Sequence, residues 1–141
     1  MEPQASDHLT GNALEDAVSA FDGFGRETCR VRAASATNPD NAQNVSFQSL
    51  VSARRRVQEL FCLDLSAAVA QDEWDFACRC FQKRHLLAHR AGVVDEAYIQ
   101  ATRDRTAIVG RKVVIELDEV LSLVSLLRKL GAYLLAHLPS P

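Results

Sequence analysis

The C-terminal segment, residues 120–138, constrains the fold more than any other part of the chain, because its apolar side chains recur every three or four residues. These positions are Val120, Leu121, Val124, Leu127, Leu130, Leu134 and Leu138. The spacing predicts one long α-helix, which Asp118 would cap. The segment is nearly long enough to span a bilayer, but Arg128 and Lys129 lie at its centre. We therefore interpret it as a packed helix of a cytoplasmic protein without a membrane span.

Three earlier segments have the same periodicity, so the sequence predicts four substantial helices. The apolar positions of the first are Leu14, Val18, Phe21, Phe24 and Val31. Gly23 and Gly25 within it predict a bend or a close contact with another helix. The second helix starts near Ser46, a favourable N-cap, and the third extends from about Asp72 to a C-cap at Gly92.

The segments between these helices contain turn-forming residues. Residues 36–41 are the clearest loop, and residues 103–112 are charged and form a second one. Asp95 is a candidate N-cap for a short helix that contains Tyr98. Residues 113–117 are largely β-branched, and they suit either an extended segment or the approach to the last helix.

Length and composition agree with a helical domain. A chain of 141 residues forms one domain with a single core, and six glycines with four prolines are few turn-formers for a many-stranded fold. We predict an all-α fold: a four-helix up-and-down bundle with one or two short extra helices. Residues 1–8 would be a flexible N-terminal tail, and residues 9–141 a single helical domain. The net charge of −2 excludes a broad basic surface but not a local basic patch.

Arg84, His85 and His89 lie within six residues of the third predicted helix and are the candidate functional residues. Each residue turns a helix by about 100°, so His85 and His89 share one face, whereas Arg84 lies about 140° from His89. Arginine binds phosphate through a planar fork, and histidine exchanges protons near neutral pH. These residue types suit cleavage of a phosphodiester without a metal. The alternative is that they are solvated or hydrogen-bonded side chains of an ordinary helix surface.

The pattern Arg84-His85-x-x-x-His89 resembles the signature of the HEPN superfamily (higher eukaryotes and prokaryotes nucleotide-binding domains). That signature is an arginine, a polar residue, three further residues and a histidine. The surroundings of the motif are also similar, since Phe81 precedes it by one turn and Tyr98 follows it. The predicted four helices, with the motif on the third, agree with the same family.

The resemblance implies a metal-independent endoribonuclease that acts as a toxin or defence effector and forms a homodimer with a composite active site. His89 would be the general base or acid for attack of a ribose 2′-hydroxyl on the adjacent phosphate. Arg84 would bind that phosphate, and His85 would orient the other groups or contact the RNA. The products would be a 2′,3′-cyclic phosphate and a 5′-hydroxyl. No cofactor is implied, and a neutralising antitoxin or a sensor protein is an expected partner.

A different function is also open under the same resemblance. The chain would then be a non-catalytic HEPN module that binds a partner protein or a nucleotide within a larger defence system. The three filled motif positions favour the enzyme, whereas the acidic net charge favours the module.

Five further residues are candidate RNA contacts. Lys83 and Arg90 flank the motif, and Arg54 and Arg55 belong to a run of three arginines in the second helix. Tyr98 would stack on a base. The alternative for the arginine run is a solvated helix face, and for Tyr98 it is packing beneath the motif helix.

No metal site is predicted. His85 and His89 share a face, but Leu86 stands where the helix of a zinc protease has its glutamate. On a helix the thiols of Cys78 and Cys80 point about 200° apart and cannot chelate one ion. The N-terminus does not resemble a signal peptide, so the four cysteines are expected to be reduced thiols in the cytoplasm.

Overall fold

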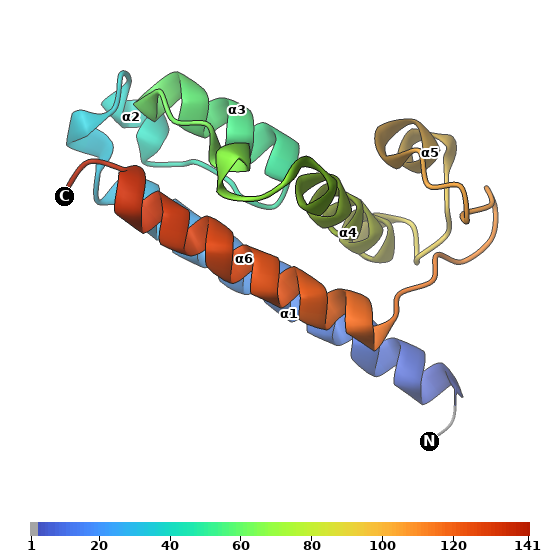
Figure 1. The fold of residues 1–141 in the computed structure, drawn as a ribbon. Helices are drawn as coiled ribbons and strands as arrows, with labels where there is room; N and C mark the ends of the chain where they lie inside the picture. The colour runs from blue at the N-terminus through green and yellow to red at the C-terminus, as the bar shows by residue number, and fades with distance from the viewer. Residues whose placement is uncertain (1–2) are drawn as a thin grey trace.

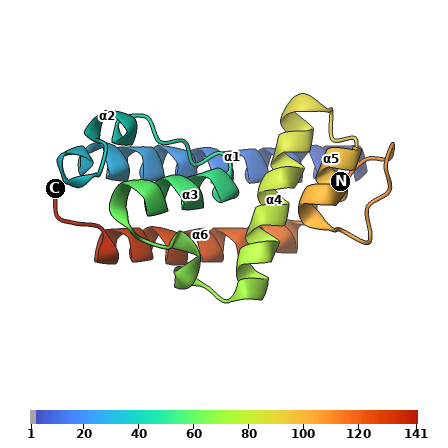
Figure 2. The same cartoon turned by 90° about the horizontal axis from the view of Figure 1, so that it is seen from above.

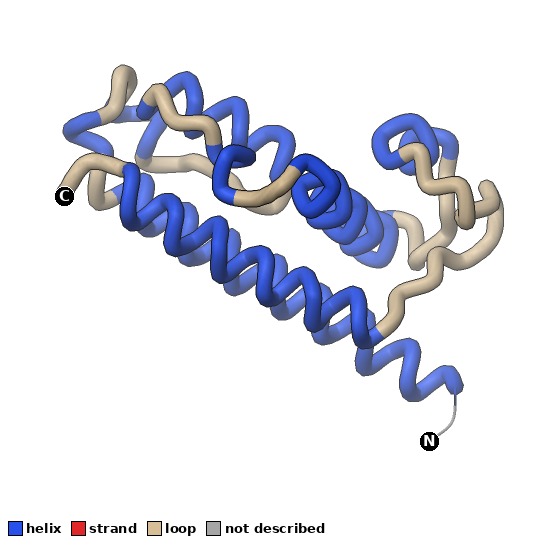
Figure 3. Tube along the Cα trace, viewed as in Figure 1, coloured by secondary structure: helices blue, strands red, loops and turns tan. Residues whose placement is uncertain are grey.

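Helices form all the regular secondary structure in the computed structural model, which describes residues 3–141, with side chains from His8 onwards. The long helices are α1 (Pro3–Arg30), α3 (Leu50–Phe61), α4 (Gln71–His89) and α6 (Leu117–His137). The short ones are η1 (Ala33–Ser35), α2 (Pro39–Ala42), η2 (Leu65–Ala68) and α5 (Glu96–Thr102). Within residues 3–141 there is no strand, only one isolated bridge between Val93 and Lys112 (Figure 3). The predicted all-α class is confirmed.

The helices are arranged in two layers. α1 and α6 lie side by side and run in the same direction, and α3 and α4 cover one face of this pair (Figure 1). Seen from above, α4 crosses both helices at a steep angle, and α5 packs against α4 (Figure 2). The up-and-down arrangement is not confirmed, because the connection after α4 returns to the N-terminal part of α1 before α6 begins (Figure 1).

The core lies between the α1–α6 pair and the helices that cover it. The ring of Phe21 in α1 makes edge-to-face contacts with Phe47, at 5.6 Å between centroids, and with Phe81 of α4, at 6.3 Å. Leu123 and Leu130 of α6 are fully buried. Each large apolar side chain buried in this way stabilises the fold by about 1.5–3 kcal/mol.

α6 is also long and apolar enough to cross a membrane, when length and composition alone are considered. In the fold it is a core helix, because its leucines pack against the other helices. Membrane-length helices of this kind occur in soluble proteins when one face is buried by protein.

The second long helix begins later than the sequence predicted, because Asp22 holds the chain before it. Oδ1 of this buried carboxylate accepts a hydrogen bond from the Phe47 backbone N–H at 2.7 Å. That contact places Phe47 in the core ahead of the helix. The N-cap is therefore Ser49, whose side chain accepts from the Ser52 N–H, and not Ser46.

Three other boundaries differ from the predicted ones. Residues 39–42, within and just beyond the predicted loop, form the single turn α2, since Asn38 is a good N-cap and Pro39 suits the first helical position. The last helix begins at Leu117 with Glu116 as its N-cap instead of Asp118. The first helix extends back to Pro3, into the segment predicted as a tail, because proline is tolerated in a first turn. Met1 and Glu2 of that predicted tail lie outside the described residues.

Gly25 marks a close contact, but the contact is with Phe47 of the segment before α3 and not, as the sequence had predicted, with another helix. A Cβ built at Gly25 would lie 2.5 Å from the ring of Phe47, whereas one at Gly23 would meet nothing within 4 Å. Neither glycine interrupts α1, which is one continuous helix. The glycine at position 25 therefore lets Phe47 pack directly on the backbone of α1.

Candidate functional site

The motif occupies the last two turns of α4, where this helix crosses α1. A Cβ at Gly11 of α1 would lie 3.5 Å from Cδ1 of Leu87, so α4 rests on α1 at this point. The helix ends just beyond the motif, since the backbone N–H groups of Arg90 and Gly92 both donate to the carbonyl oxygen of Leu86. Gly92 has φ +78°, a conformation that glycine adopts without strain. The C-cap is nevertheless Arg90 and not Gly92 as the sequence predicted, and Ala91, with φ +52°, is the first left-handed residue after the helix.

His85 and His89 form an exposed pair on one face of α4, as their spacing predicted. Their ring centroids are 4.6 Å apart, and the ring planes are tilted by 49°. Both side chains are open to solvent. One imidazole can therefore give a proton while its neighbour accepts one, and a ligand can reach both rings from outside.

Arg84 points toward α1 instead of toward the histidines. Its Nε lies 2.7 Å from Glu15 Oε2, and its Nη2 lies 3.1 Å from Glu15 Oε1, so the guanidinium forms a two-pronged contact with one carboxylate. The Arg84 side chain is only 12% exposed. The hydrogen bonds from Arg84 lower the pKa of Glu15, and the same pair raises the pKa of Arg84. Both groups are therefore charged at neutral pH.

A single chain does not bring the three motif residues to one point. The histidine pair faces solvent, whereas the phosphate-binding fork of Arg84 is filled by Glu15. Arg84 and His89 lie about 140° apart around the helix. A ligand that contacts both must displace Glu15 or receive one of the groups from another molecule.

Lys83 is buried and cannot contact RNA in this conformation. Its Nζ donates to the backbone carbonyl of Val114 at 2.7 Å and to Oε2 of Glu119 at 2.8 Å. The ammonium thereby fastens the segment before α6 to α4. The sequence placed Lys83 at the cleft because it adjoins Arg84, but adjacent helical residues point about 100° apart.

Tyr98 is also buried, at 2% exposure, and packs with Leu86 and Val94 beneath the motif helix. Its hydroxyl donates to Oδ2 of Asp104 at 2.6 Å. Burial and this hydrogen bond raise the pKa of the phenol. Tyr98 therefore cannot stack on a base in this conformation. It packs beneath the motif helix, which is the alternative role that the sequence left open. Asp95 caps α5 as predicted, since its side chain accepts from the Tyr98 N–H.

The other candidate RNA contacts are exposed arginines at two different places. Arg90 follows His89 as the C-cap of α4 and forms a loose ion pair with Asp95, at 3.4 Å. Arg54 pairs with Asp64 at 3.0 Å and lies over the ring of Trp74, near the start of α4. Trp74 and His89 are separated by about 22 Å along the helix, at 1.5 Å per residue. Arg55 is exposed on the same helix as Arg54. Arg54 therefore lies far from the histidines, and Arg90, which follows His89 in the chain, has its guanidinium near Asp95.

Three acidic residues that bind these side chains were not predicted from the sequence. They are Glu15 for Arg84, Glu119 for Lys83 and Asp104 for Tyr98. Glu15 is 69 positions from Arg84 and Glu119 is 36 positions from Lys83, so no local spacing indicates either contact. Within the part of the chain that the structure describes, no three histidine, cysteine or acidic side chains are grouped as metal ligands.

Comparisons of this chain with protein-family models, with curated proteins and with solved structures give no match.

Proposed function

We propose that the protein is a metal-independent endoribonuclease of HEPN type. The observation that carries the proposal is the exposed pair of His85 and His89, whose rings are 4.6 Å apart on one face of α4, directly after an arginine. Two adjoining imidazoles on a solvent-facing surface are suited to proton transfer. The motif also lies on the third of four long helices, as the resemblance to the family requires.

The chemistry would be attack of a ribose 2′-hydroxyl on the neighbouring phosphorus. His89 would take the proton of the hydroxyl or give one to the leaving 5′-oxygen, with His85 as the second imidazole. The new bond to the 2′-oxygen forms as the bond to the 5′-oxygen breaks, leaving a 2′,3′-cyclic phosphate and a 5′-hydroxyl. Arg84 would neutralise the charge that builds on the phosphate oxygens.

A homodimer would add a second histidine pair to the site, while each Arg84 would still have to exchange Glu15 for a phosphate. In one chain the arginine faces α1 and the imidazoles face solvent. Two copies that face each other across the exposed side of α4 would place four imidazoles around one cleft. RNA bound there would offer phosphate oxygens to Arg84 in place of Glu15, since a guanidinium fork binds carboxylate and phosphate in the same geometry.

The test is incubation of the purified protein with a labelled mixed-sequence RNA in excess EDTA. We expect cleavage that leaves cyclic phosphate ends, with rates about 10²–10⁴-fold lower for His89→Ala and for Arg84→Ala. His137→Ala is the matched control, because His137 is also exposed but stacks on Tyr133 at the end of α6. Equal cleavage by all four proteins would assign the activity to a contaminant, and no cleavage by the folded wild type would refute the proposal.

The second candidate is a HEPN-type module that binds a partner protein or a nucleotide without chemistry. The contact between Arg84 and Glu15 favours it, because a fork already filled by a carboxylate does not need a phosphate. No cleavage in the same assay by the folded wild type, by His89→Ala or by Arg84→Ala is the result that this candidate predicts.

The resemblance to the HEPN family also suggests where the enzyme acts and what its activity does to the cell. We place the enzyme in the cytoplasm, as a toxin or defence effector whose RNA cleavage arrests growth, with an antitoxin or a sensor protein that controls it. Expression of the wild type should then be toxic, and expression of His89→Ala should be harmless. Toxicity that persists in His89→Ala would separate growth arrest from the proposed site.

A further inference from the structure

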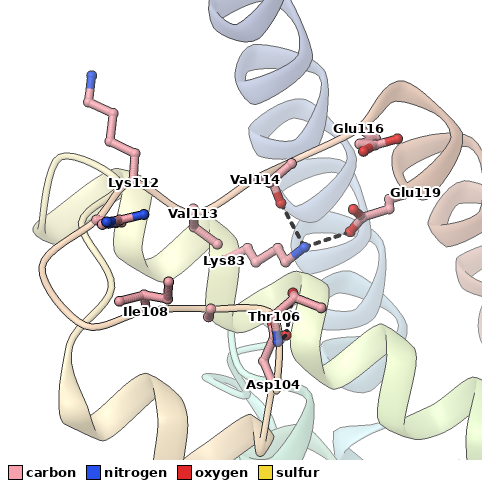
Figure 4. A pocket seen from close by; sticks show the side chains of 11 residues that line it. Lys83, Asp104, Thr106, Ile108, Lys112, Val113, Val114, Glu116 and Glu119 are labelled. Carbon is pink, nitrogen blue, oxygen red and sulfur yellow. Dashed lines mark hydrogen bonds and ion pairs between the residues drawn. The ribbon is translucent and has the colours of Figure 1, made fainter.

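A cavity of about 510 Å³ lies between α4 and the segment that leads from α5 to α6, away from the histidine pair. Lys83 crosses beneath Val113 and reaches the Val114 carbonyl and Glu119 (Figure 4). Around α4, Lys83 points about 200° from His85, so the cavity opens in a different direction from the candidate catalytic face. An adjoining hollow of about 480 Å³ shares Lys83, Glu119 and other lining residues with it.

Positive charge is concentrated at the rim of these two hollows. Besides Lys83, the cations that line them are Arg79, Arg103, Arg105, Arg111 and Lys112. None of these five forms an ion pair with another residue in the described part of the chain. Arg79 lies over the ring of Phe76, and Lys112 extends from the rim into solvent (Figure 4). This concentration contrasts with a chain whose net charge is −2.

The carboxylates that line the hollows do not neutralise the rim. Both oxygens of Asp104 are occupied, Oδ2 by the Tyr98 hydroxyl and Oδ1 by the backbone N–H and hydroxyl of Thr106. Glu119 is bonded to Lys83. Glu116 is the remaining carboxylate of the lining. Six cations against three carboxylates leave three positive charges in excess over the two hollows together.

The shape of the cavity suits a small ligand better than a strand of nucleic acid. Its volume lies within the range of small-molecule sites, about 300–1,000 Å³. The apolar side chains of Ile108 and Val113 contribute to its walls (Figure 4). Proteins that hold single strands use instead a long groove with aromatic platforms, whereas here Tyr98 is buried and the partly buried ring of Phe76 is covered by Arg79.

We propose that these two adjoining hollows together bind a small ligand that carries several adjoining phosphate groups. Guanidinium groups bind phosphate oxygens through paired hydrogen bonds, and cations distributed over both hollows favour a ligand with anionic groups at several positions. A linear polyphosphate has such groups, and a single orthophosphate does not. The proposal does not depend on ribonuclease activity, because the cavity and the histidine pair face different directions.

The experiment is calorimetric titration of the full chain at low salt with tripolyphosphate, with ATP, with orthophosphate and with a short RNA oligonucleotide lacking terminal phosphates. We expect one site per chain for tripolyphosphate and ATP, with affinity that falls steeply as salt is added and at least about tenfold weaker binding of orthophosphate. Arg105→Ala combined with Arg111→Ala removes one rim charge from each hollow and should weaken tripolyphosphate binding roughly tenfold or more.

The matched control combines Arg56→Ala with Arg128→Ala, which removes the same charge from exposed helical positions elsewhere. We expect this control to bind tripolyphosphate as the wild type does. The proposal is overturned if tripolyphosphate does not bind, if the control loses as much affinity as the rim variant, or if only the RNA oligonucleotide binds. Circular dichroism of both double variants distinguishes a lost site from a lost fold.

Discussion

Arg84 donates two hydrogen bonds to Glu15 across the contact of α4 with α1, at 2.7 and 3.1 Å, although 69 positions separate them in the chain. The carboxylate occupies the fork in the way that two phosphate oxygens would. Glu15 is itself 43% exposed, so the contact can be opened from the solvent side. If RNA is the ligand of Arg84, then Glu15 competes with it.

Replacing Glu15 by glutamine should raise the rate of RNA cleavage. The amide removes the negative charge that holds the fork, and the loss of one exposed ion pair, about 1 kcal/mol, corresponds to about a fivefold rise in kcat/KM at low substrate. Steady-state rates on a labelled RNA measure the change. Asp16→Asn, at the next and exposed position of α1, should leave the rate unchanged. A lower rate for Glu15→Gln would mean that Glu15 positions Arg84 instead of competing for it.

Replacing Gly23 or Gly25 of α1 by alanine should change the free energy of unfolding in opposite directions. A Cβ at position 25 would lie 2.5 Å from the buried ring of Phe47, so Gly25→Ala should lower the free energy of unfolding by about 2 kcal/mol. A Cβ at position 23 meets nothing within 4 Å, so Gly23→Ala should raise it by up to about 1 kcal/mol through helix propensity. Urea unfolding of the two variants compares them directly. Equal destabilisation by both would show that α1 needs glycine for its backbone and not for its contact.

Local spacing was enough to predict the four long helices. Leu127, Leu130 and Leu134 are buried, as their spacing on one face of α6 predicted. Leu121 of the same predicted set is instead 59% exposed, and Leu123, which the set did not include, is fully buried. The same reasoning correctly placed His85 and His89 on one face of α4. It also identified the Asp95 cap, because a capping side chain acts on the backbone of the next turn.

Contacts between distant segments were not predictable, because they depend on which helices cross. The spacing that placed Arg84 about 140° from His89 contains no information about Glu15, which contacts Arg84 from α1. The start of α3 shifted for the same reason, since Asp22 of α1 holds the Phe47 N–H in the preceding segment. Parallel packing of α1 and α6 also depends on the long path from α4 back to the start of α1 (Figure 1).

Replacing Lys83 should lower the stability of the fold. Lys83→Met leaves the Val114 carbonyl and Glu119 without their donor at a buried position, which should lower the free energy of unfolding by about 2 kcal/mol. Lys129→Met is the control, because Lys129 is 55% exposed and forms only a 3.5 Å pair with Glu73. Chemical unfolding of both variants gives the comparison. Stability of Lys83→Met equal to that of the wild type would show that the segment before α6 does not need this anchor.

The ionised carboxylate of Asp104 should stabilise the fold at neutral pH, and this contribution should be lost in acid. Burial disfavours its charge, but the hydrogen bonds from Tyr98 and Thr106 outweigh burial and lower its pKa below the usual 3.8. The folded protein therefore keeps the carboxylate ionised at pH values where the unfolded chain takes up a proton. The contribution is complete well above pH 3.8 and is lost as the pH falls through the lowered pKa.

Asp104→Asn tests this dependence, because the amide does not titrate. Urea midpoints measured between pH 6 and pH 3 should fall less for this variant than for the wild type. Asp40→Asn, at an exposed position of α2 where no donor engages the carboxylate, should keep the wild-type slope. Identical slopes for Asp104→Asn and the wild type would mean that the network around Tyr98 does not depend on charge.

The cysteines should differ in reactivity toward iodoacetamide at pH 8. Burial raises the pKa of Cys29 and Cys78 to about 11 and that of Cys80 to about 12, so about one thiol in a thousand or fewer is ionised at this pH. Cys62 is exposed at the C-terminal end of α3. Mass spectrometry of the native wild type should therefore find one rapid adduct, on Cys62, and the native Cys62→Ser variant should form none. In urea the wild type should form four adducts. A rapid adduct on Cys80 of the native protein would instead show that α4 opens from the core, because only exposure can return that thiol to its ordinary reactivity.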